Sequence, residues 1–412
     1  MWANHEERYV GFHLLSIYSS NHEGCTTTMS TNFHALVFGA SGISGWALVK
    51  EALSYPSPAT FSQVTALSNR PLSISDAQWP NDPRLHLASG IDLTATVDTV
   101  VEALKEKVSN VATVTHVFLF VYLDPGKDKK TLKEVNTNLI KTAVEAVQKV
   151  SPNIKSFILQ TGGKAYGVER PDVVKIVPPL KETYPRVPKP IADDIFYYSQ
   201  YDVLDSLSKG ASWTFTEIRP DAMIGFVPGT NVMNMAQGLA FYLSLYREVH
   251  GAEAKVPYPG AEHGYRHKHT DTFQDIAAKM EIYAALNPEK CGSGKAFNVA
   301  NGDVVTWADV WPGICAYFGL EGIGPQGTFE PPAEFVKKHS EAWTNMVKRE
   351  GLKASRLDLY YWPFMDFLMD KAFFDRQYDL SAARAVGFKE TIDTVKAYAI
   401  AFDRMRAAKI IP

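Results

Sequence analysis

Residues 34–45 read HALVFGASGISG, and this stretch decides the fold. An apolar run enters a turn with glycines at positions 39, 42 and 45, and a helix-like segment follows. Glycines at such a turn permit close approach of a pyrophosphate and close packing of helix on strand, and free N–H groups at a helix start favour phosphate. The spacing differs by one residue from the G-x-G-x-x-G fingerprint, and a turn built for packing alone is the alternative. The strand before the turn and the helix after it favour a nucleotide site. We predict cofactor contacts at Gly39, Ser41, Gly42, Ile43 and Gly45.

Strand-like and helix-like segments alternate along the chain from residue 33 onwards, which is typical of a parallel sheet with right-handed crossovers. Continuous apolar runs such as residues 114–121 indicate strands that are buried on both faces. We predict an α/β fold, a Rossmann-type doubly wound parallel sheet with a mostly helical C-terminal region that caps the substrate. The expected strands cover residues 34–38, 64–67, 114–121, 154–159 and 213–218, with one more ending near residue 87, and the expected helices cover residues 45–53, 95–108 and 128–150.

Two stretches interrupt this alternation. Residues 163–195 are rich in proline and predict a long loop, of a length that is usually functional or disordered. The sequence beyond residue 225 is mostly helical and aromatic. The predicted division is an N-terminal extension over residues 1–30, expected to be disordered, an NADP-binding domain over 31–225 and a helical substrate-binding region over 226–412, with 267–301 returning to the Rossmann core. We interpret residues 1–28 as a dispensable extension or the product of a misplaced start codon.

The residues that follow the second expected strand favour one nicotinamide cofactor over the other. An NAD site places an acid there, on the ribose 2′-hydroxyl, whereas this chain has Ser68-Asn69-Arg70. We predict contacts at Asn69 and Arg70 and a preference for NADPH, because Arg70 can meet a 2′-phosphate; a solvated loop arginine is the alternative. Asp92 is either an adenine contact or the N-cap of a helix over residues 93–108.

Composition excludes several classes of protein. The chain has 412 residues, of which 42 are Lys or Arg and 45 are Asp or Glu, so charge gives no support to a nucleic-acid or anionic-membrane partner. Three cysteines without a C-x-x-C pair indicate a reducing compartment, without disulfides or structural zinc. No apolar run reaches the roughly 20 residues that span a bilayer, and we expect a cytoplasmic protein. Three clustered histidines, His263, His267 and His269, are interpreted as solvated loop residues rather than a metal site.

No tyrosine has a lysine four residues later, so the Tyr-x-x-x-Lys pair of short-chain dehydrogenases must come from separate segments, or the chain is not such an enzyme. Several blocks in order resemble the progesterone 5β-reductase/iridoid synthase-like (PRISE) family of atypical short-chain dehydrogenases. The resemblance covers about residue 33 to the C-terminus. Its blocks are residues 39–45, 115–118, 159–164, 196–198, 219–220, 225–226, 296–299, 301–303 and 306–307.

The resemblance implies that Lys164 and Tyr197 are the catalytic pair. A phenol is a good donor to a developing enolate or alkoxide, and a nearby ammonium supports it. Without the family pattern, Lys164 would be taken for a surface lysine and Tyr197 for a core aromatic residue. We further predict cofactor contacts at Asp92, Leu93, Val121, Gln160, Tyr197, Met223, Asn231 and Val232, and substrate contacts at Tyr122 and Tyr166.

Departures from the family pattern leave the substrate open. The family's asparagine, acid, tryptophan and histidine are replaced by Ile195, Tyr201, Tyr122 and Ala165. We predict an NADPH-dependent enzyme that reduces the carbon–carbon double bond of a small α,β-unsaturated carbonyl compound. Direct carbonyl reduction or epimerisation with the same residues is the first alternative, and a non-catalytic NADP sensor the second. The sequence leaves open whether the chain forms a homodimer. The aromatic residues between 360 and 374 either line an apolar pocket or pack in the core.

Overall fold

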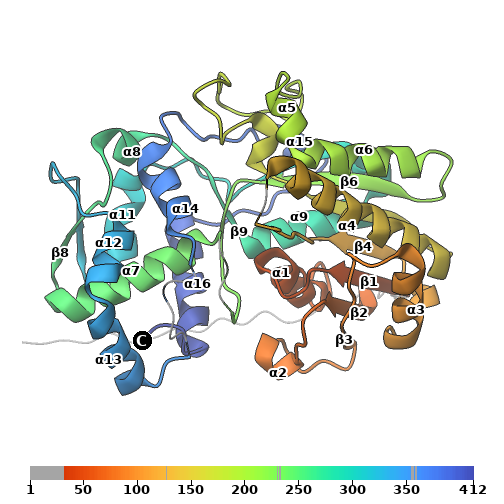
Figure 1. Ribbon diagram of the computed structural model, residues 1–412, viewed down its shortest axis with the longest axis horizontal. Helices are drawn as coiled ribbons and strands as arrows, with labels where there is room; N and C mark the ends of the chain where they lie inside the picture. Colours follow the sequence, from red (N-terminus) through yellow and green to blue (C-terminus); the bar gives the residue numbers. More distant parts are fainter. Residues whose placement is uncertain (1–31, 127, 230, 232, 354–356, 358–359) are drawn as a thin grey trace, which may run out of the picture. The chain divides into compact units, whose positions relative to one another are not determined.

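The apolar run before the glycine turn forms β1 (Phe33–Phe38), an inner strand of a seven-stranded sheet. The computed structural model describes residues 32–126, 128–229, 231, 233–353, 357 and 360–412 (Figure 1). The expected extension over residues 1–30 and the expected contact at Val232 lie outside these residues. The strand order is β10-β6-β5-β4-β1-β2-β3, and every pair is parallel. The other strands are β2 (Phe61–Ser68), β3 (Leu85–Ser89), β4 (His116–Leu119), β5 (Ser156–Gln160), β6 (Thr214–Pro220) and β10 (Lys295–Val299).

Helices cover both faces of this sheet, which confirms the Rossmann-type doubly wound architecture. Ala35 and Val37 of β1 belong to one buried cluster, together with α1 (Ile43–Ala52) and α9 (Gln274–Leu286). Leu36 and Phe38 belong to another, together with α3 (Val97–Lys107) and α4 (Lys129–Val150). Alternate side chains therefore enter opposite cores, and this is why Ala35 to Phe38 of the strand are all apolar. The helix α6 (Phe196–Ser208) packs beside α4.

Register places the ends of neighbouring strands together. Phe38, the last residue of β1, is level with Leu67 of β2 and Leu119 of β4. The glycine turn, residues 68–70 and the segment after β4 therefore meet at the carboxyl edge of the sheet, where open α/β sheets bind their ligands.

The remaining residues form mainly helices and two short strand pairs. The strands β7 (Ala222–Ile224) and β9 (Asp271–Phe273) form one pair, and β8 (Lys255–Pro257) and β11 (Glu321–Ile323) form the other. In Figure 1 most of the C-terminal helices lie on one side of β9 and the large sheet lies on the other. The helices are α2 (Ile74–Ala77), α5 (Ile191–Asp194), α7 (Met235–His250), α8 (Glu262–Arg266), α10 (Pro288–Cys291), α11 (Trp307–Tyr317), α12 (Pro332–Lys338), α13 (Ser340–Glu350), α14 (Trp362–Asp366), α15 (Ser381–Ala385) and α16 (Thr394–Ala407), with short helical turns at Val111–Thr113, Gly163–Tyr166 and Phe367–Lys371.

The proline-rich stretch over residues 163–195 is held by the C-terminal part of the chain. Leu180 donates its N–H to the carbonyl of Gln377 at 2.7 Å and accepts from the N–H of Asp379 at 2.8 Å. Beside this contact, Arg376 is buried between Asp221 and Asp271 and forms ion pairs with both. Burial raises the pKa of Asp221 to about 6, against the opposing effect of Arg376. These contacts fix the C-terminal segment against the carboxyl edge of the sheet.

Candidate active site

The glycine turn is shaped by backbone contacts on two sides and is open on the third. Gly39 has a φ of +79°, and a Cβ there would stand 2.7 Å from the carbonyl oxygen of Phe120. A Cβ on Gly45 would collide with the carbonyl oxygen of Gly39, so the helix can approach the strand only with glycine. A Cβ on Gly42 would meet only that same oxygen, at 3.4 Å.

The start of α1 at this turn suits an anion. Its N-cap, Gly42, has no side-chain hydrogen bond, and the first helical turn contains no acid. The first N–H groups of a helix have no partner within the helix, so in α1 they and the positive end of the helix dipole lie at the turn, beside the exposed Ser41. Ile43 is buried and anchors the helix. The residues present fit a dinucleotide pyrophosphate, as the sequence predicts.

The end of β2 presents an exposed arginine at the same edge. Asn69 and Arg70 are exposed, and the Ser68 hydroxyl donates to the carbonyl of Arg70 at 2.8 Å. Among the described residues none forms an ion pair with Arg70, so its guanidinium is available to a 2′-phosphate.

The loop after β3 separates the two interpretations of Asp92. Its carboxylate accepts from the N–H and the hydroxyl of Thr94, at 2.9 and 2.7 Å. The helix α3 begins later, and its N-cap is Thr96, whose hydroxyl accepts from the N–H of Thr99. The alternative of Asp92 as a helix N-cap is therefore wrong, because a turn separates it from the helix. The adenine contact stays a prediction, as does that of the buried Leu93.

The other expected cofactor contacts follow the carboxyl ends of further strands. Val121 comes after β4, and Met223 is a buried residue of β7. The side-chain oxygen of Gln160, the last residue of β5, is buried without a hydrogen-bond partner among the described residues. An orphaned acceptor at this edge suits a donor on a bound cofactor. The N–H of Asn231 instead donates to the Gln237 side chain at 2.9 Å.

Tyr197 and Lys164 both lie against the ring of Phe196. Tyr197 is partly buried in the first turn of α6, and its hydroxyl lies 3.7 Å from where a Cβ of Gly162 would stand. Lys164 follows that glycine, and its Nζ lies 5.7 Å from the centre of the Phe196 ring. The Phe196 ring in turn contacts those of Tyr197 and Tyr122, with centroids 4.6 and 5.8 Å apart. Tyr122, expected near the substrate, is thus exposed beside the proposed pair.

The two tyrosines of the Phe-Tyr-Tyr block have different hydroxyl partners. The Tyr198 hydroxyl donates to the carbonyl of Ala165 at 2.6 Å and accepts from the N–H of Val187 at 3.1 Å. The Tyr197 hydroxyl has no hydrogen-bond partner among the described residues. Tyr198 is therefore a structural link between α6 and the segment after β5, and Tyr197 is the tyrosine whose hydroxyl is free to meet a ligand.

One carboxylate at this group was missed by sequence reasoning. Glu169 pairs with Lys164, with Oε1 and Nζ 2.9 Å apart. Burial first, and then the Glu169 charge, raise the pKa of Tyr197 above its ordinary range. Glu169 also contributes to the raised pKa of Tyr122, after burial and Asp124. Glu169 belongs to no motif block, and its position follows only from the path of the chain after Lys164.

A buried polar network lies behind the proposed pair. Glu217 of β6 accepts from the Thr161 hydroxyl at 2.6 Å and from Arg219 at 2.7 Å. Arg219 also donates to the Tyr166 hydroxyl at 3.3 Å, and Tyr166 donates to Asn298 at 2.6 Å. Because Tyr166 is buried and bonded in this way, it holds the segment after Lys164 to the edge strand; its contact with a substrate stays a prediction.

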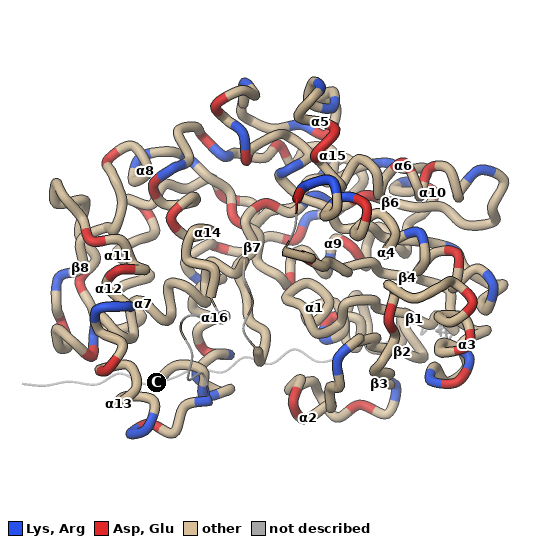
Figure 2. Tube along the Cα trace, viewed as in Figure 1, with Lys and Arg blue, Asp and Glu red and all other residues tan. Residues whose placement is uncertain are grey.

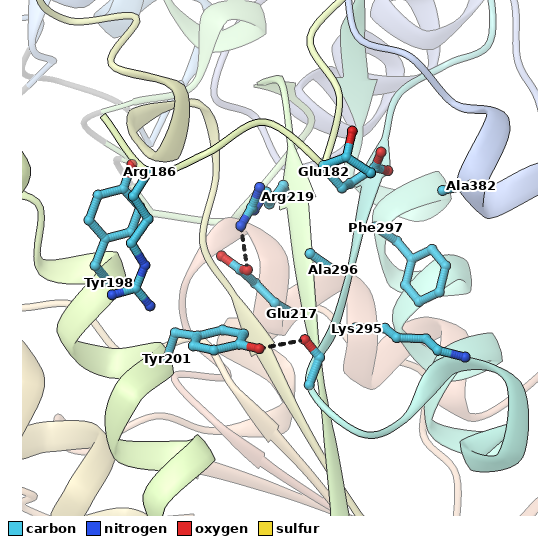
Figure 3. A pocket seen from close by; sticks show the side chains of 12 residues that line it. Glu182, Arg186, Tyr198, Tyr201, Glu217, Arg219, Lys295, Ala296, Phe297 and Ala382 are labelled. Atoms are coloured by element: carbon cyan, nitrogen blue, oxygen red, sulfur yellow. Dashed lines mark hydrogen bonds and ion pairs between the residues drawn. The ribbon is translucent and has the colours of Figure 1, made fainter. Parts of the chain in front are cut away.

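Glu217 and Arg219 of this network line a cavity of about 470 Å³, and Figure 3 shows their side chains pointing toward one another there. Tyr198 and Tyr201 of α6 line the same cavity. Tyr201, which stands in place of the family's acid, donates its hydroxyl to the carbonyl of Gly294 at 2.9 Å. It therefore joins α6 to the segment before β10.

Two of the three clustered histidines contact backbone carbonyls through their rings. His263 and His267 are within hydrogen-bond distance of the carbonyls of Asp370 and Ala372. His269 is buried against Trp307, with ring centroids 5.1 Å apart, so its interpretation as a solvated loop residue is wrong. The described part of the chain contains no group of three or more side chains placed to ligate a metal.

Charge and helix hydropathy can be followed along the described residues. Lysines and arginines are interspersed with acids along the trace in Figure 2. No helix in the ranges that the structure describes has the length and apolar character needed to cross a membrane.

The chain is similar to known proteins over most of its length. A family model described as a PRISE-like Rossmann-fold domain matches residues 35–412. The short chain dehydrogenase ausT of Aspergillus calidoustus is 37% identical over 395 residues, which cover 93% of this chain and 95% of that protein. The (S)-8-oxocitronellyl enol synthase ISY1 of Nepeta racemosa is 28% identical over 384 residues, which cover 92% and 93%.

Two solved structures share the fold. GDP-mannoheptose C4 reductase of Campylobacter jejuni, with NADP bound, has a TM-score of 0.56 and 15% identity, and the match covers 92% of this chain and 99% of that one. UDP-glucuronic acid 4-epimerase of Bacillus cereus, in complex with NAD, has a TM-score of 0.56 and 12% identity, with coverages of 91% and 99%.

Proposed function

The chain belongs to the PRISE-like Rossmann-fold family of short-chain dehydrogenases, and on that premise we propose that it uses NADPH to reduce the carbon–carbon double bond of a small α,β-unsaturated carbonyl compound. Family membership confirms the resemblance inferred from the ordered sequence blocks and makes the chain an oxidoreductase. The cofactor, the bond that is reduced and the residues that act are the proposal.

The observation that carries the proposal is that the Tyr197 hydroxyl has no hydrogen-bond partner among the described residues, while the Phe196 ring lies against both the Tyr197 ring and the Lys164 ammonium. The hydroxyl of Tyr198, the neighbour of Tyr197, forms hydrogen bonds with two backbone groups, whereas the Tyr197 hydroxyl forms none with the described residues. Burial and the Glu169 carboxylate raise the pKa of Tyr197, so the phenol keeps its proton at neutral pH. A protonated phenol donates a hydrogen bond to a carbonyl oxygen and stabilises the negative charge that develops there.

NADPH, when bound, supplies the hydride, which goes to the β-carbon of the substrate. Tyr197 polarises the carbonyl and stabilises the enolate oxygen, and Lys164 supports it with its positive charge. The open glycine turn and the start of α1 hold the pyrophosphate. Arg70, which pairs with no acid in the part of the chain that the structure describes, meets the 2′-phosphate, and the Gln160 side-chain oxygen accepts a hydrogen bond from the cofactor.

Direct reduction of a carbonyl is the second candidate, because the same residues serve hydride attack at the carbonyl carbon. Two solved structures with this fold, described above, are named a C4 reductase and a 4-epimerase, and for this reason direct carbonyl reduction is kept as the second candidate. A panel of enones and ketones with NADPH, with products identified by mass and NMR, separates the two reactions. Saturated ketones from enones support the proposal, and allylic alcohols from the same substrates replace it with the second candidate.

A further inference from the structure

The turn that carries Lys164 is too short to hold its own position. It covers Gly163–Tyr166, shortly after the end of β5. The Ala165 N–H donates to the carbonyl of Gly162 at 3.0 Å, and the Gly167 N–H donates to that of Lys164 at 3.0 Å. A single helical turn is unstable by itself, because its few hydrogen bonds do not offset the ordering of its residues. The place of Lys164 therefore depends on contacts from outside the turn.

Two side chains of β6 supply such contacts at both ends of the turn. Glu217 accepts from the Thr161 hydroxyl at 2.6 Å through one carboxylate oxygen and from Arg219 at 2.7 Å through the other. Arg219 also donates to the Tyr166 hydroxyl at 3.3 Å, and its guanidinium lies 5.2 Å from the centre of that ring. Thr161 stands three residues before Lys164, and Tyr166 stands two residues after it. One ion pair therefore contacts both ends of the segment that contains Lys164.

The strand that carries this ion pair gives it a firm base. β6 lies between β5 and β10 and pairs with both. Glu217 and Arg219 are two residues apart on this strand, so their side chains leave from the same face. Between them, the carbonyl of Ile218 accepts from the N–H of Thr161 at 2.9 Å. The ion pair thus ties the Lys164 turn to an inner strand of the sheet.

The ion pair borders the cavity of about 470 Å³ on one side (Figure 3). The side chains of Glu217 and Arg219 are only 2% and 13% exposed, so removal of one leaves the other as a nearly buried charge without its partner. The remaining charged group would turn toward the cavity, where water can solvate it, and would release its contact with the turn. Loss of either residue therefore frees an end of the segment.

The turn is also bonded to the helix that carries Tyr197. The Tyr198 hydroxyl of α6 donates to the carbonyl of Ala165, the residue after Lys164, at 2.6 Å. That bond fixes the distance between α6 and the turn but leaves the turn free to rotate about it. The contacts from β6 set the orientation of the turn, and with it the direction in which Lys164 points relative to Tyr197.

We propose that Glu217 and Arg219 are positioning residues: their ion pair holds the turn after β5 at both ends, and so keeps the Lys164 ammonium where it supports the Tyr197 hydroxyl. The inference rests on the proposed function, since it takes Lys164 and Tyr197 to be the pair that acts on the substrate. It adds two residues that act through Lys164 and not on the substrate itself.

A double-mutant cycle in kcat tests this role, with saturating NADPH and an enone that wild type reduces. A displacement of about 1 Å at a reacting group costs about 10²-fold in rate, so Arg219→Ala should lower kcat by about that factor. In a Lys164→Ala background the same substitution should lower kcat by less than about threefold, because the residue that it misplaces is already gone. A residue needed only for the stability of the fold lowers kcat by the same factor in both backgrounds, and equal factors would overturn the inference.

Arg219→Lys takes the place of Arg219→Ala in the cycle if the alanine variant does not fold. Lysine keeps the charge beside Glu217 but lacks the planar fork that reaches Glu217 and Tyr166 together. The displacement of the turn is then smaller, and we expect a loss in kcat of about tenfold that again disappears in the Lys164→Ala background. Equal losses in the two backgrounds would overturn the inference here too.

Amide hydrogen exchange reports on the turn without any reaction. In Arg219→Ala, or in Arg219→Lys where that variant is used, residues 162–167 should exchange at least about tenfold faster than in wild type, because local opening becomes easier. Arg84→Ala is the matched control. Arg84 pairs with Asp82 at 2.6 Å and is 23% exposed, and it stands directly before β3, at the amino edge of the sheet and away from the site. The control should keep the wild-type exchange of residues 162–167 and the wild-type kcat.

Failure of the proposed function gives a different pattern of results. If wild type reduces no enone, or if Lys164→Ala keeps full kcat, the proposed reaction or its catalytic pair is wrong. Exchange of residues 162–167 then decides whether the ion pair holds the turn. Faster exchange in the Arg219 variant alone supports the inference, and exchange equal to that of wild type overturns it.

Discussion

Gly163→Ala, alone and with Tyr378→Phe, tests how the C-terminal segment supports the turn that carries Lys164. A Cβ on Gly163 would stand 2.8 Å from the Tyr378 hydroxyl oxygen and 3.1 Å from a methyl group of Val168. The Tyr378 ring cannot move aside easily, because it is 3% exposed, packs on the Tyr166 ring at 5.6 Å and lies in a segment bonded to Leu180. The hydroxyl therefore occupies the space of a side chain at position 163.

The expected magnitude follows from overpacking. Insertion of a methyl group into such a contact costs about 1–3 kcal/mol of unfolding free energy. Tyr378→Phe removes a buried hydroxyl that has no hydrogen-bond partner among the described residues, so it should be neutral or stabilise the protein by about 1 kcal/mol. The pair should be non-additive: Gly163→Ala should cost at least about 1 kcal/mol less in the Tyr378→Phe background, with the Val168 contact left as the residual cost.

Equilibrium denaturation in guanidinium chloride gives the four unfolding free energies, and kcat measured with NADPH reports on the turn before Lys164. Gly163→Ala should lose activity in the wild-type background and recover part of it with Tyr378→Phe. Strict additivity of the two substitutions in stability would refute the reasoning, because it would show that the hydroxyl and the new methyl group do not compete for space.

Two further predictions concern the cofactor and pH. Arg70→Ala should weaken NADPH binding by roughly 1.5–3 kcal/mol and leave NADH nearly unchanged in fluorescence titrations; equal wild-type affinity for the two cofactors would contradict the assignment. Glu281 of α9 is buried with both carboxylate oxygens unpaired among the described residues, and burial raises its pKa well above the ordinary range. Above about pH 4.3 the unfolded chain releases the Glu281 proton, whereas the folded protein keeps it. The free energy of unfolding therefore falls as the pH rises, by up to about 1.4 kcal/mol per pH unit, until the pH passes the pKa of Glu281 in the folded protein. Glu281→Gln should remove this part of the slope between pH 5 and 8, and identical slopes for both proteins would show that Glu281 is not protonated in the folded state.

The sheet was predictable because its signals are local. A few residues are enough to predict the apolar run before Gly39, the glycine turn and the buried run that contains β4. The parallel order follows from the alternation of strand-like and helix-like segments. Boundaries were less predictable: α3 begins two residues later than expected because Thr96 caps it. The edge strand β10 pairs with β6 across a long separation in sequence, which no local pattern shows.

The proposed site rests on sequence motifs for its catalytic pair. Lys164 and Tyr197 came from the ordered blocks, and the choice of Tyr197 over Tyr198 now has a physical reason in the bonds of the Tyr198 hydroxyl. Glu169 carries no motif, since its position depends on how the chain turns after Lys164. His269 was misjudged because burial in a polar stretch depends on the aromatic side chains that pack over it.

The most direct test of the central claim is kcat for NADPH-driven reduction of an enone by wild type and by Tyr197→Phe, with NADPH binding measured on the same samples. The Tyr197 hydroxyl is proposed as the donor at the substrate oxygen, and loss of one such donor lowers kcat by about 10²–10³-fold. The account predicts a loss of that size with NADPH affinity within a few-fold of wild type, and a smaller loss for Tyr198→Phe, which weakens packing instead. Full activity of Tyr197→Phe on every enone that wild type reduces would contradict the account.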